Sequence, residues 1–545
     1  MNAILQPPLP KNQQQAALWP AFHGSCRTLA LSKLPDQGLK IIVVPNLQIA
    51  YQTQSELHFF SPQCTVDVFP DWEVLPYDHF SPHEDIVSQR LALLHQLPQR
   101  QNGFLIISSS SLMHRLPPVN YINHSTLQLS LHQTLSINDF KHRLLETGYQ
   151  HVDQVLQHGE FAQRGSILDL FPMGSTEPYR IELFDDEIES LRTFDPDSQK
   201  TITKIQSIDI LPGREFPLTA DGITHFRQQW RQTFAGNPKI CPVYNSISEG
   251  RPIAGIEFYL SLFFKSTATF FDFIPSNSTF VLFEGIHASA TQFQADFQHR
   301  FEQLRYDTSR PILSPDAIYL TVDNVFHQFK SHSRIKLEST QSIDNPHNQS
   351  LPLPNVRITR ASSSPLAALQ DFIHQSNTPI LICAESPGRQ EVLLDILSGL
   401  NVTIKTHQYW SDLSTPLPPL SLITAPLQEG FIIENYLSVI TETELFGASI
   451  QQQRKSTTKQ DPNAIIKNLI ELQIGSPVVH IQHGVGRYQG LTTLTTGSMT
   501  AEYLTLHYAN DDIMYVPVAS LHLISRYTGG DNDHAPLHRL GSSQW

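Results

Sequence analysis

The first 120 residues alternate between apolar runs and a segment of helical periodicity. Residues 40–44 (KIIVV) and 104–107 (FLII) are apolar runs of the kind that form buried β-strands. Between them, residues 84–97 carry apolar side chains at intervals close to the period of an α-helix. Strand, helix and strand in this order predict a parallel sheet within residues 1–120.

A different pattern follows in residues 121–212, where short segments alternate in polarity around a turn at Asp185 and Asp186. Alternation with a period of two is typical of half-buried strands, so this stretch is predicted to be a β-rich insert. Helical and strand patterns return over residues 213–338, and we expect these residues to complete the first α/β domain.

Two polar stretches without a pattern, residues 338–350 and 451–463, are predicted to be linkers. Residues 352–447 lie between them and have the pattern of a second α/β domain. In this domain we expect a strand at 379–383 and a helix at 389–400. The sequence does not indicate what the second domain does.

The C-terminal part is predicted to be all β after a linker and short helix at 448–473. Residues 474–530 alternate in polarity and hold closely spaced glycines, which predicts a small SH3-like β-barrel. Residues 531–545 have no terminating pattern, so we expect them to begin a connector. The expected fold is a multidomain α/β protein: a degenerate P-loop-type parallel-sheet domain with a β-rich insert, a second α/β domain and a C-terminal barrel.

Composition narrows the classes of function. The net charge is −14 and 16% of the residues are charged, whereas a surface that follows a nucleic-acid backbone needs clustered Lys and Arg. The four cysteines form no CxxC pair and the 25 histidines show no ligand spacing, so we expect no disulfide and no metal site. The sequence has no signal peptide and no apolar run long enough to span a bilayer, which predicts a cytoplasmic protein.

One segment near the N-terminus has the spacing of a phosphate-binding loop without its residues. In a working loop, G-x-x-x-x-G-K-[ST], main-chain N–H groups wrap the phosphates and the lysine reaches the terminal ones. Here Ala21, Cys26 and Arg27 replace the two glycines and the lysine, and only Thr28 is retained. The apolar strand that ends at Phe283 lacks the magnesium-binding aspartate at that position. Spacing alone favours a chance resemblance, and in either case we expect no ATP turnover.

Strand alternation in the segment RIELF places Arg180 and Phe184 on one face and Ile181 and Leu183 on the other. The aliphatic pair is expected to face the core. An aromatic ring beside an arginine is typical of protein interfaces. The alternative is that Phe184 covers a minor core while Arg180 pairs with a local carboxylate such as Asp186, and the residues alone leave both open.

The predicted barrel is poor in positive charge. Between residues 475 and 528 the Lys and Arg residues are Arg487 and Arg526, which is too few for a phosphate-binding surface, so we expect a protein partner. A barrel with an exposed strand can bind by adding its edge to a partner's sheet. Leu504 and Leu506 point to the same side of their strand, so one or both are also candidates for the core.

Several segments together resemble one family, the bacterial transcription-repair coupling factors. They are residues 71–78 (DWEVLPYD), 80–86 (FSPHEDI), 149–155 (YQHVDQV), 164–172 (RGSILDLFP), 478–480 (VVH), 483–488 (HGVGRY) and 521–527 (LHLISRY). They occur in the order of the family's domains, and the resemblance runs nearly end to end, weakest at 339–447. The family's first domains are similar to UvrB of nucleotide excision repair but have lost its nucleotide site. By this resemblance, the segment from Ala21 to Thr28 is a decayed phosphate loop.

The resemblance also implies partners. In the family, the β-rich insert binds the damage-recognition ATPase UvrA at positions that match Arg164, Arg180 and Phe184. The barrel binds the β subunit of RNA polymerase at positions that match Tyr503 and Leu504. This implies the recruitment of UvrA to stalled transcription complexes in transcription-coupled nucleotide excision repair.

The resemblance also implies that two parts of the family's proteins are missing from this sequence. The family's ATP-driven DNA translocase and its C-terminal domain, which masks the UvrA surface, have no counterpart here. We therefore expect a monomer without catalytic residues or cofactor, in which the UvrA surface is open and from which a connector at 531–545 would lead to the translocase.

Two other classes of function are alternatives. A UvrB-like damage-verifying ATPase or helicase would need the substituted loop and aspartate, as well as an aromatic hairpin that the sequence lacks. A sequence-specific DNA-binding regulator conflicts with the charge and with the lack of a helix-turn-helix pattern. Weak, non-specific contact between the first domain and DNA is a further alternative that the sequence leaves open.

Overall fold

The computed structural model describes residues 8–10, 15–337, 350–359, 365–400, 402–413, 418–447, 475–480, 484–496, 499–509, 512–517, 524–526 and 537. The predicted linker and helix at 448–473 lie outside the described residues, as do nearly all of the linker at 338–350 and of the connector at 531–545. The chain forms two compact units, and each is described by itself. The first unit is Met1–Trp72, Glu84–Gly236 and Phe258–Gln451, and the second is Glu73–His83, Asn237–Glu257 and Gln452–Trp545.

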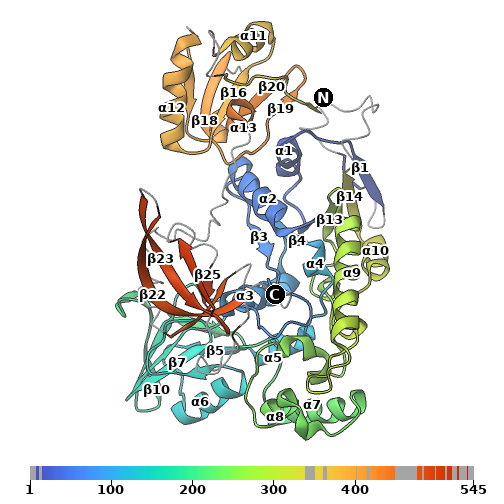
Figure 1. The fold of residues 1–545 in the computed structure, drawn as a ribbon, viewed down its shortest axis with the longest axis vertical. Coiled ribbons are helices and arrows are strands. Elements are labelled where there is room, and N and C mark those ends of the chain that lie inside the picture. Colours follow the sequence, from blue (N-terminus) through green and yellow to red (C-terminus); the bar gives the residue numbers. More distant parts are fainter. Residues whose placement is uncertain are drawn as a thin grey trace. The chain divides into compact units, whose positions relative to one another are not determined.

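A six-stranded, fully parallel sheet organises the N-terminal domain of the first unit (Figure 1). In sheet order, its strands are β1 (Ala16–Trp19), β14 (Ser333–Leu337), β13 (Thr279–Leu282), β2 (Lys40–Val44), β4 (Phe104–Ser108) and β3 (Val66–Phe69). Every residue of β2 and β4 is buried, as expected for a parallel sheet that is covered on both faces. The two predicted strands and their parallel arrangement are confirmed.

Helices connect these strands, and the predicted helix at 84–97 is α3. The α-helices of residues 15–337 that belong to the first unit are α1 (Cys26–Ser32), α2 (Leu47–Phe60), α3 (Glu84–Gln96), α4 (Ser109–Leu112), α5 (Val119–Ser125), α6 (Ile137–Glu146), α7 (Ala220–Thr233), α9 (Ile286–Leu304) and α10 (Val322–Gln328). The helix α8 (Pro242–Ser248) and the 3-10 helix η2 (Pro238–Ile240) belong to the second unit. The other 3-10 helices of residues 15–337 are η1 (Leu97–Gln99), η3 (Ile256–Phe263), η4 (Phe270–Asp272), η5 (Pro315–Ala317) and η6 (Phe329–Ser331). The side chain of Asn46 starts α2 by accepting a hydrogen bond from the Ile49 amide, and α2 then packs against β3 and β4.

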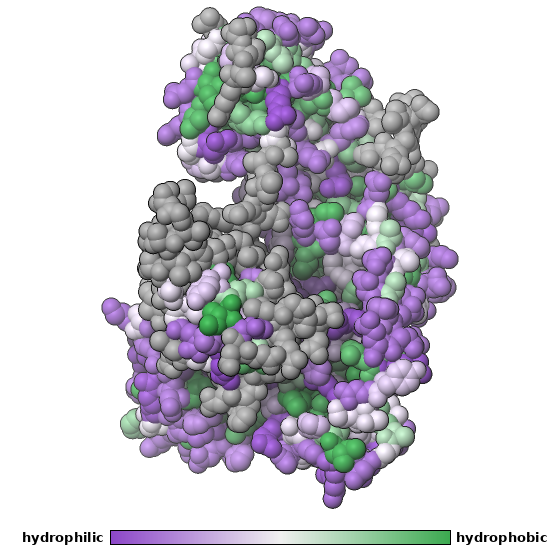
Figure 2. All heavy atoms as spheres, in the orientation of Figure 1, coloured by the Kyte–Doolittle hydropathy of each residue, from purple (hydrophilic) through white to green (hydrophobic). Residues whose placement is uncertain are grey.

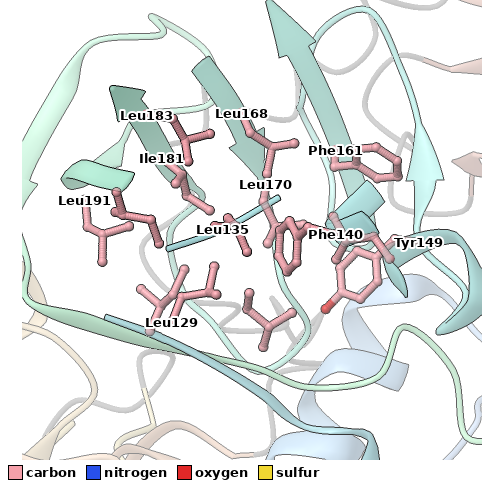
Figure 3. Close-up of a cluster of buried hydrophobic side chains, with 14 residues drawn as sticks. Leu129, Leu135, Phe140, Tyr149, Phe161, Leu168, Leu170, Ile181, Leu183 and Leu191 are labelled. Atoms are coloured by element: carbon pink, nitrogen blue, oxygen red, sulfur yellow. The ribbon is translucent and has the colours of Figure 1, made fainter. Parts of the chain in front are cut away.

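The stretch between α5 and α7 is rich in β-structure, as predicted. A six-stranded sheet has the order β11 (Thr201–Lys204), β10 (Glu187–Phe194), β9 (Tyr179–Phe184), β8 (Ile167–Leu170), β7 (Glu160–Arg164) and β6 (Gln150–His151). A separate antiparallel pair joins β5 (Leu127–Ser130) to β12 (Ser207–Ile210). Figure 3 shows the core beneath these strands, in which Ile181 and Leu183 point toward Leu168 and Leu170. The predicted inward orientation of the aliphatic pair is confirmed.

The second α/β domain contains a mixed sheet. In sheet order, its strands are β15 (Ser350–Leu351), β19 (Phe431–Ile433), β20 (Leu437–Thr441), β16 (Ile380–Ala384), β18 (Leu420–Thr424) and β17 (Lys405–His407). Its helices are α11 (Ala367–Gln375), α12 (Pro387–Leu397), η7 (Ser398–Leu400), η8 (Trp410–Asp412) and α13 (Glu442–Phe446). The predicted strand at 379–383 is β16 and the predicted helix at 389–400 is α12 followed by η7.

The second unit contains a five-stranded antiparallel sheet. In sheet order, its strands are β24 (Ile513–Pro517), β23 (Met499–His507), β22 (Gly484–Thr496), β21 (Pro477–His480) and β25 (Ile524–Arg526). Among the described residues, β24 and β25 are the two edges of this sheet and no pairing joins them. The all-β prediction is therefore confirmed, while closure into a barrel stays a prediction.

On the face drawn in Figure 2, hydrophobic residues form small, separate patches between hydrophilic ones. Within the described part of the chain, no helix is both long and apolar enough to cross a membrane. The coloured residues of that face therefore form no single broad apolar patch.

Candidate functional site

The segment with the spacing of a phosphate loop lies between β1 and α1. Ala21 is buried, and so are Cys26 and Thr28, the first and third residues of α1. The Arg27 guanidinium lies over the ring of Phe283, with 4.2 Å between its central carbon and the ring centroid. Phe283 directly follows β13, where the sequence analysis looked for the aspartate. The structure thus brings the substituted lysine and aspartate positions together as a cation–π pair.

A buried carboxylate that the sequence analysis missed lies beside this segment. Glu56 of α2 is 1% exposed, and its Oε1 accepts hydrogen bonds from the Ser25 hydroxyl at 2.8 Å and from the Gln52 amide at 3.1 Å. Burial raises the pKa of the Glu56 carboxyl, and its hydrogen bonds and the Arg27 charge offset this only in part. The buried face of α2 consists of Ala50, Thr53, Glu56, Leu57 and Phe60. This helical spacing is the signal that would have placed Glu56 in the interior.

Replacing Glu56 with glutamine is expected to leave the chain at least as stable at neutral pH, because the variant removes a buried charge. Its advantage should grow as the pH rises from the ordinary carboxyl pKa to the raised pKa of Glu56. Over that window, the folded chain retains a proton that the unfolded chain has lost, so the unchanged protein loses stability. Urea unfolding of both proteins between about pH 4 and 8 measures this difference. A glutamine variant that becomes relatively less stable with rising pH would contradict the expected direction.

The three insert residues predicted to bind a partner share one region of the insert, and one buried carboxylate joins two of them. Arg180 donates two hydrogen bonds to Asp169, from Nε at 2.7 Å and from Nη2 at 2.8 Å. Asp169 is 2% exposed, and the exposed Arg164 approaches the same carboxylate at 3.5 Å. The expectation that Arg180 pairs with a carboxylate is confirmed, but the partner is Asp169 on β8 rather than Asp186. Arg180 is therefore fixed in place by an ion pair that the sequence analysis missed.

Phe184 is the exposed member of this group. It ends β9 with 69% of its surface exposed, and it pairs with Glu187 across a two-residue turn at Asp185 and Asp186. The predicted turn is confirmed, and the alternative that Phe184 covers a minor core is wrong. A further cross-strand ion pair joins Arg192 to Glu182 on the same sheet. The face of the insert that carries Arg180 thus combines paired charges with a small buried cluster around Phe194, and the exposed ring of Phe184 lies at its end.

Leu504 of the C-terminal sheet lies in the hydrophobic core. It is 0% exposed and clusters with Val478, Leu506, Tyr508 and other buried residues. Its strand β23 pairs with β22 on one side and β24 on the other, so β23 has no free edge at this point. Leu504 is therefore a core residue, and main-chain pairing occupies both sides of β23 at this point. That Tyr503 and Leu504 contact the polymerase β subunit stays a prediction.

Tyr503, the other predicted contact, pairs through its backbone with Thr492 of β22 and Pro517 of β24, and its side chain lies outside the described residues. The outer strand β24 carries exposed hydrophobic side chains, Ile513 and Tyr515, each 45% exposed. An edge strand with two exposed apolar side chains has the features needed for strand addition.

Among the residues that the structure describes, no group of three or more His, Cys, Asp or Glu side chains could hold a metal ion. The described cysteines are all free thiols, three of them buried. Three features of the described residues are suited to contact with a partner: an anchored arginine pair, an exposed aromatic ring and a sheet edge.

Comparisons with protein families match three parts of the chain. The family described as the UvrB interaction domain matches residues 127–216, which cover the β-rich insert. The MFD D3 domain matches residues 372–445 of the second α/β domain. The CarD-like/TRCF RID domain matches residues 472–528, which hold the C-terminal sheet.

Individual relatives match the whole chain. The transcription-repair-coupling factor of Haemophilus influenzae is 42% identical over 100% of this chain and 48% of its own length. That of Escherichia coli K12 is 40% identical over 98% of this chain and 47% of its own length. That of Bacillus subtilis is 26% identical over 96% of this chain and 46% of its own length. The chain therefore spans about half the length of these relatives. From end to end, it belongs to the same family as the transcription-repair coupling factors.

Proposed function

We propose that this chain contains the partner-binding part of a transcription-repair coupling factor. In this proposal, the β-rich insert recruits UvrA, the C-terminal sheet closes into a small barrel that binds the β subunit of RNA polymerase, and together they link a stalled polymerase to nucleotide excision repair. The matches to the UvrB interaction domain and to the CarD-like/TRCF RID domain support the two binding roles. The relatives are transcription-repair-coupling factors, and this supports the combination of the two roles in one protein.

The observation that carries the UvrA role is the exposure of Phe184 at the tip of a rigid sheet. The ring of Phe184 is 69% exposed, and aromatic and arginine side chains contribute most of the binding energy at many protein interfaces. Arg164 contributes a second exposed group, since 57% of its side chain is exposed. Arg180 acts as a positioning residue, because its guanidinium is committed to Asp169.

Replacing Phe184 with alanine is expected to weaken UvrA binding by about 1–2 kcal/mol without changing the stability of the insert. The matched control is Ile202→Ala, which removes a 52% exposed side chain from β11 of the same sheet. Calorimetric titration of the three proteins with UvrA at fixed salt gives the dissociation constants, and about 1.4 kcal/mol corresponds to a tenfold change. Arg180→Ala is a poorer test, because it leaves the buried Asp169 without its main partner and lowers stability as well.

Two outcomes would count against the UvrA role. Equal affinity of the Phe184→Ala and unchanged chains for UvrA would show that Phe184 is not part of the interface. If the unchanged chain does not bind UvrA at tens of micromolar, roughly the limit for a specific encounter, the proposed UvrA surface is not open in this chain.

For the polymerase role, we propose that β24 rather than β23 meets the partner. Strand β24 is an edge of the described sheet, and Ile513 and Tyr515 project from it into solvent. Main-chain pairing along an edge supplies affinity, and neighbouring side chains select the partner. Leu504 would then act on the partner only indirectly, because it pairs with Val516 of β24.

The alternative, a UvrB-like damage-verifying ATPase or helicase, finds no support in the nucleotide segment. Arg27 and Phe283 fill the positions of lysine and aspartate and pack on each other. We therefore propose that this chain turns over no nucleotide and needs no cofactor.

A further inference from the structure

The remnant phosphate loop is in direct contact with the second α/β domain, and both lie within the first compact unit. The amide of His23 donates to the Ser350 hydroxyl at 3.0 Å, and the amide of Ser25 donates to the Glu429 carbonyl at 3.1 Å. Ser350 begins β15, and Glu429 comes two residues before β19. Both amides lie between the two former glycine positions, where a working loop turns its N–H groups toward phosphate. Here protein oxygens accept these hydrogen bonds.

The fit between the two backbones is close. Gly24 has φ +52°, and a Cβ at this position would lie 2.5 Å from the Gly430 carbonyl oxygen and 2.7 Å from that of Glu429. The contact therefore excludes a side chain at position 24, and the turn at 429–430 lies directly against the loop. Gly430 is confined by its own domain, since its Cβ would meet the Val439 carbonyl oxygen at 2.4 Å.

An apolar contact accompanies these hydrogen bonds. The ring of Trp410 in η8 meets Phe59 and Phe60 at the C-terminal end of α2, with centroid distances of 5.7 and 4.8 Å and edge-to-face geometry. Aromatic pairs in this geometry are attractive beyond their area of contact. Two independent contacts, one polar and one aromatic, thus join the first and second α/β domains.

We propose that the remnant nucleotide loop is a docking socket for the second α/β domain, in which the turn at 429–430 takes the place of a nucleotide's phosphates. A loop whose buried N–H groups have lost their ligand must find other acceptors, because an unpaired buried amide is costly. Neutral carbonyl and hydroxyl oxygens supply these acceptors without a metal ion or a dissociable ligand. The socket then holds the first and second α/β domains in a fixed arrangement, and nucleotide binding does not regulate this arrangement.

The variant Gly24→Ala tests the socket, because its methyl group would collide with the two carbonyl oxygens. We expect the Ser25 amide to exchange with deuterium at least about tenfold faster than in the unchanged chain. The matched control is Gly236→Ala, which also has a positive φ, +96°, but has no atom within 4 Å of the added Cβ. It should leave exchange at Ser25 unchanged, so the effect of backbone strain alone is removed.

A second variant keeps the test decisive if Gly24→Ala misfolds, which faster exchange throughout β2 and β4, the buried central strands of the same domain, would reveal. Ser350→Ala removes one acceptor without a collision, and it should accelerate exchange at His23 while sparing those strands. Unchanged exchange at His23 in Ser350→Ala, or at Ser25 in a folded Gly24→Ala, overturns the proposal. Protection of residues 23–28 by added MgATP in the unchanged chain also overturns it, because the loop would then still accept a nucleotide.

Discussion

Replacing Glu215 with alanine is expected to lower the free energy of unfolding by about 3–5 kcal/mol, because it strands a buried positive charge. Arg90 of α3 is 0% exposed, and its Nε donates to Glu215 at 2.6 Å. Its Nη1 donates to the Pro70 carbonyl at 3.0 Å, and the guanidinium lies 4.8 Å from the ring of Phe69. With Glu215 gone, Arg90 loses the carboxylate that it is hydrogen-bonded to, and the carboxylate of Asp71, whose pKa the Arg90 charge helps to lower, is the negative charge that still acts on it.

Urea unfolding, followed by a probe within the first unit, measures this effect. The matched control is Glu302→Ala, which breaks the ion pair of Glu302 with Arg305 on the surface of α9. Both side chains of that pair are exposed, so the control should change stability by no more than about 1 kcal/mol. A loss in Glu215→Ala as small as in the control would show that the Arg90 charge reaches water.

Replacing Leu504 with alanine is expected to destabilise the C-terminal sheet by about 2–5 kcal/mol, the range for emptying a buried leucine site. Leu504 is 0% exposed and pairs with Leu491 on one side and Val516 on the other. Any loss of polymerase binding in this variant should therefore follow from the loss of the folded sheet.

The comparison variant is Tyr515→Ala, which changes an exposed side chain on β24. We expect its stability to stay within about 0.5 kcal/mol of the unchanged chain while its affinity for the polymerase β subunit falls. Melting curves and binding titrations on both variants separate the two effects. A Leu504→Ala protein that keeps its melting temperature and loses binding would return Leu504 to the interface.

Local sequence patterns predicted a helix or strand correctly where all of its residues on a given face have the same surroundings, either core or solvent. The strands β2, β4 and β16 are buried on both faces, so their apolar runs are continuous. The alternation around Ile181 and Leu183 was equally clear, because one face of β9 covers the core in Figure 3.

Contacts between distant segments were not predictable in the same way. That Arg180 meets Asp169 depends on which strand lies beside β9 and in which register. The hydrogen bond between His23 and Ser350 joins residues that are 327 positions apart, and no periodic pattern in the sequence predicts it. Side-chain parity placed Leu504 and Leu506 on one side of β23, but it could not say whether that side faces the core or a partner.

The β-rich insert begins and ends at neighbouring points, because its first strand, β5, pairs with its last strand, β12. Leu127 at its beginning lies opposite Ile210 at its end, so the chain departs and returns at neighbouring points. None of the strands of the parallel sheet comes from the residues in between. A segment with adjacent ends can be removed, or exchanged for another, without stretching the fold that carries it. Residues 127–210 can therefore be deleted or exchanged as one unit, because neither operation removes a strand of the parallel sheet.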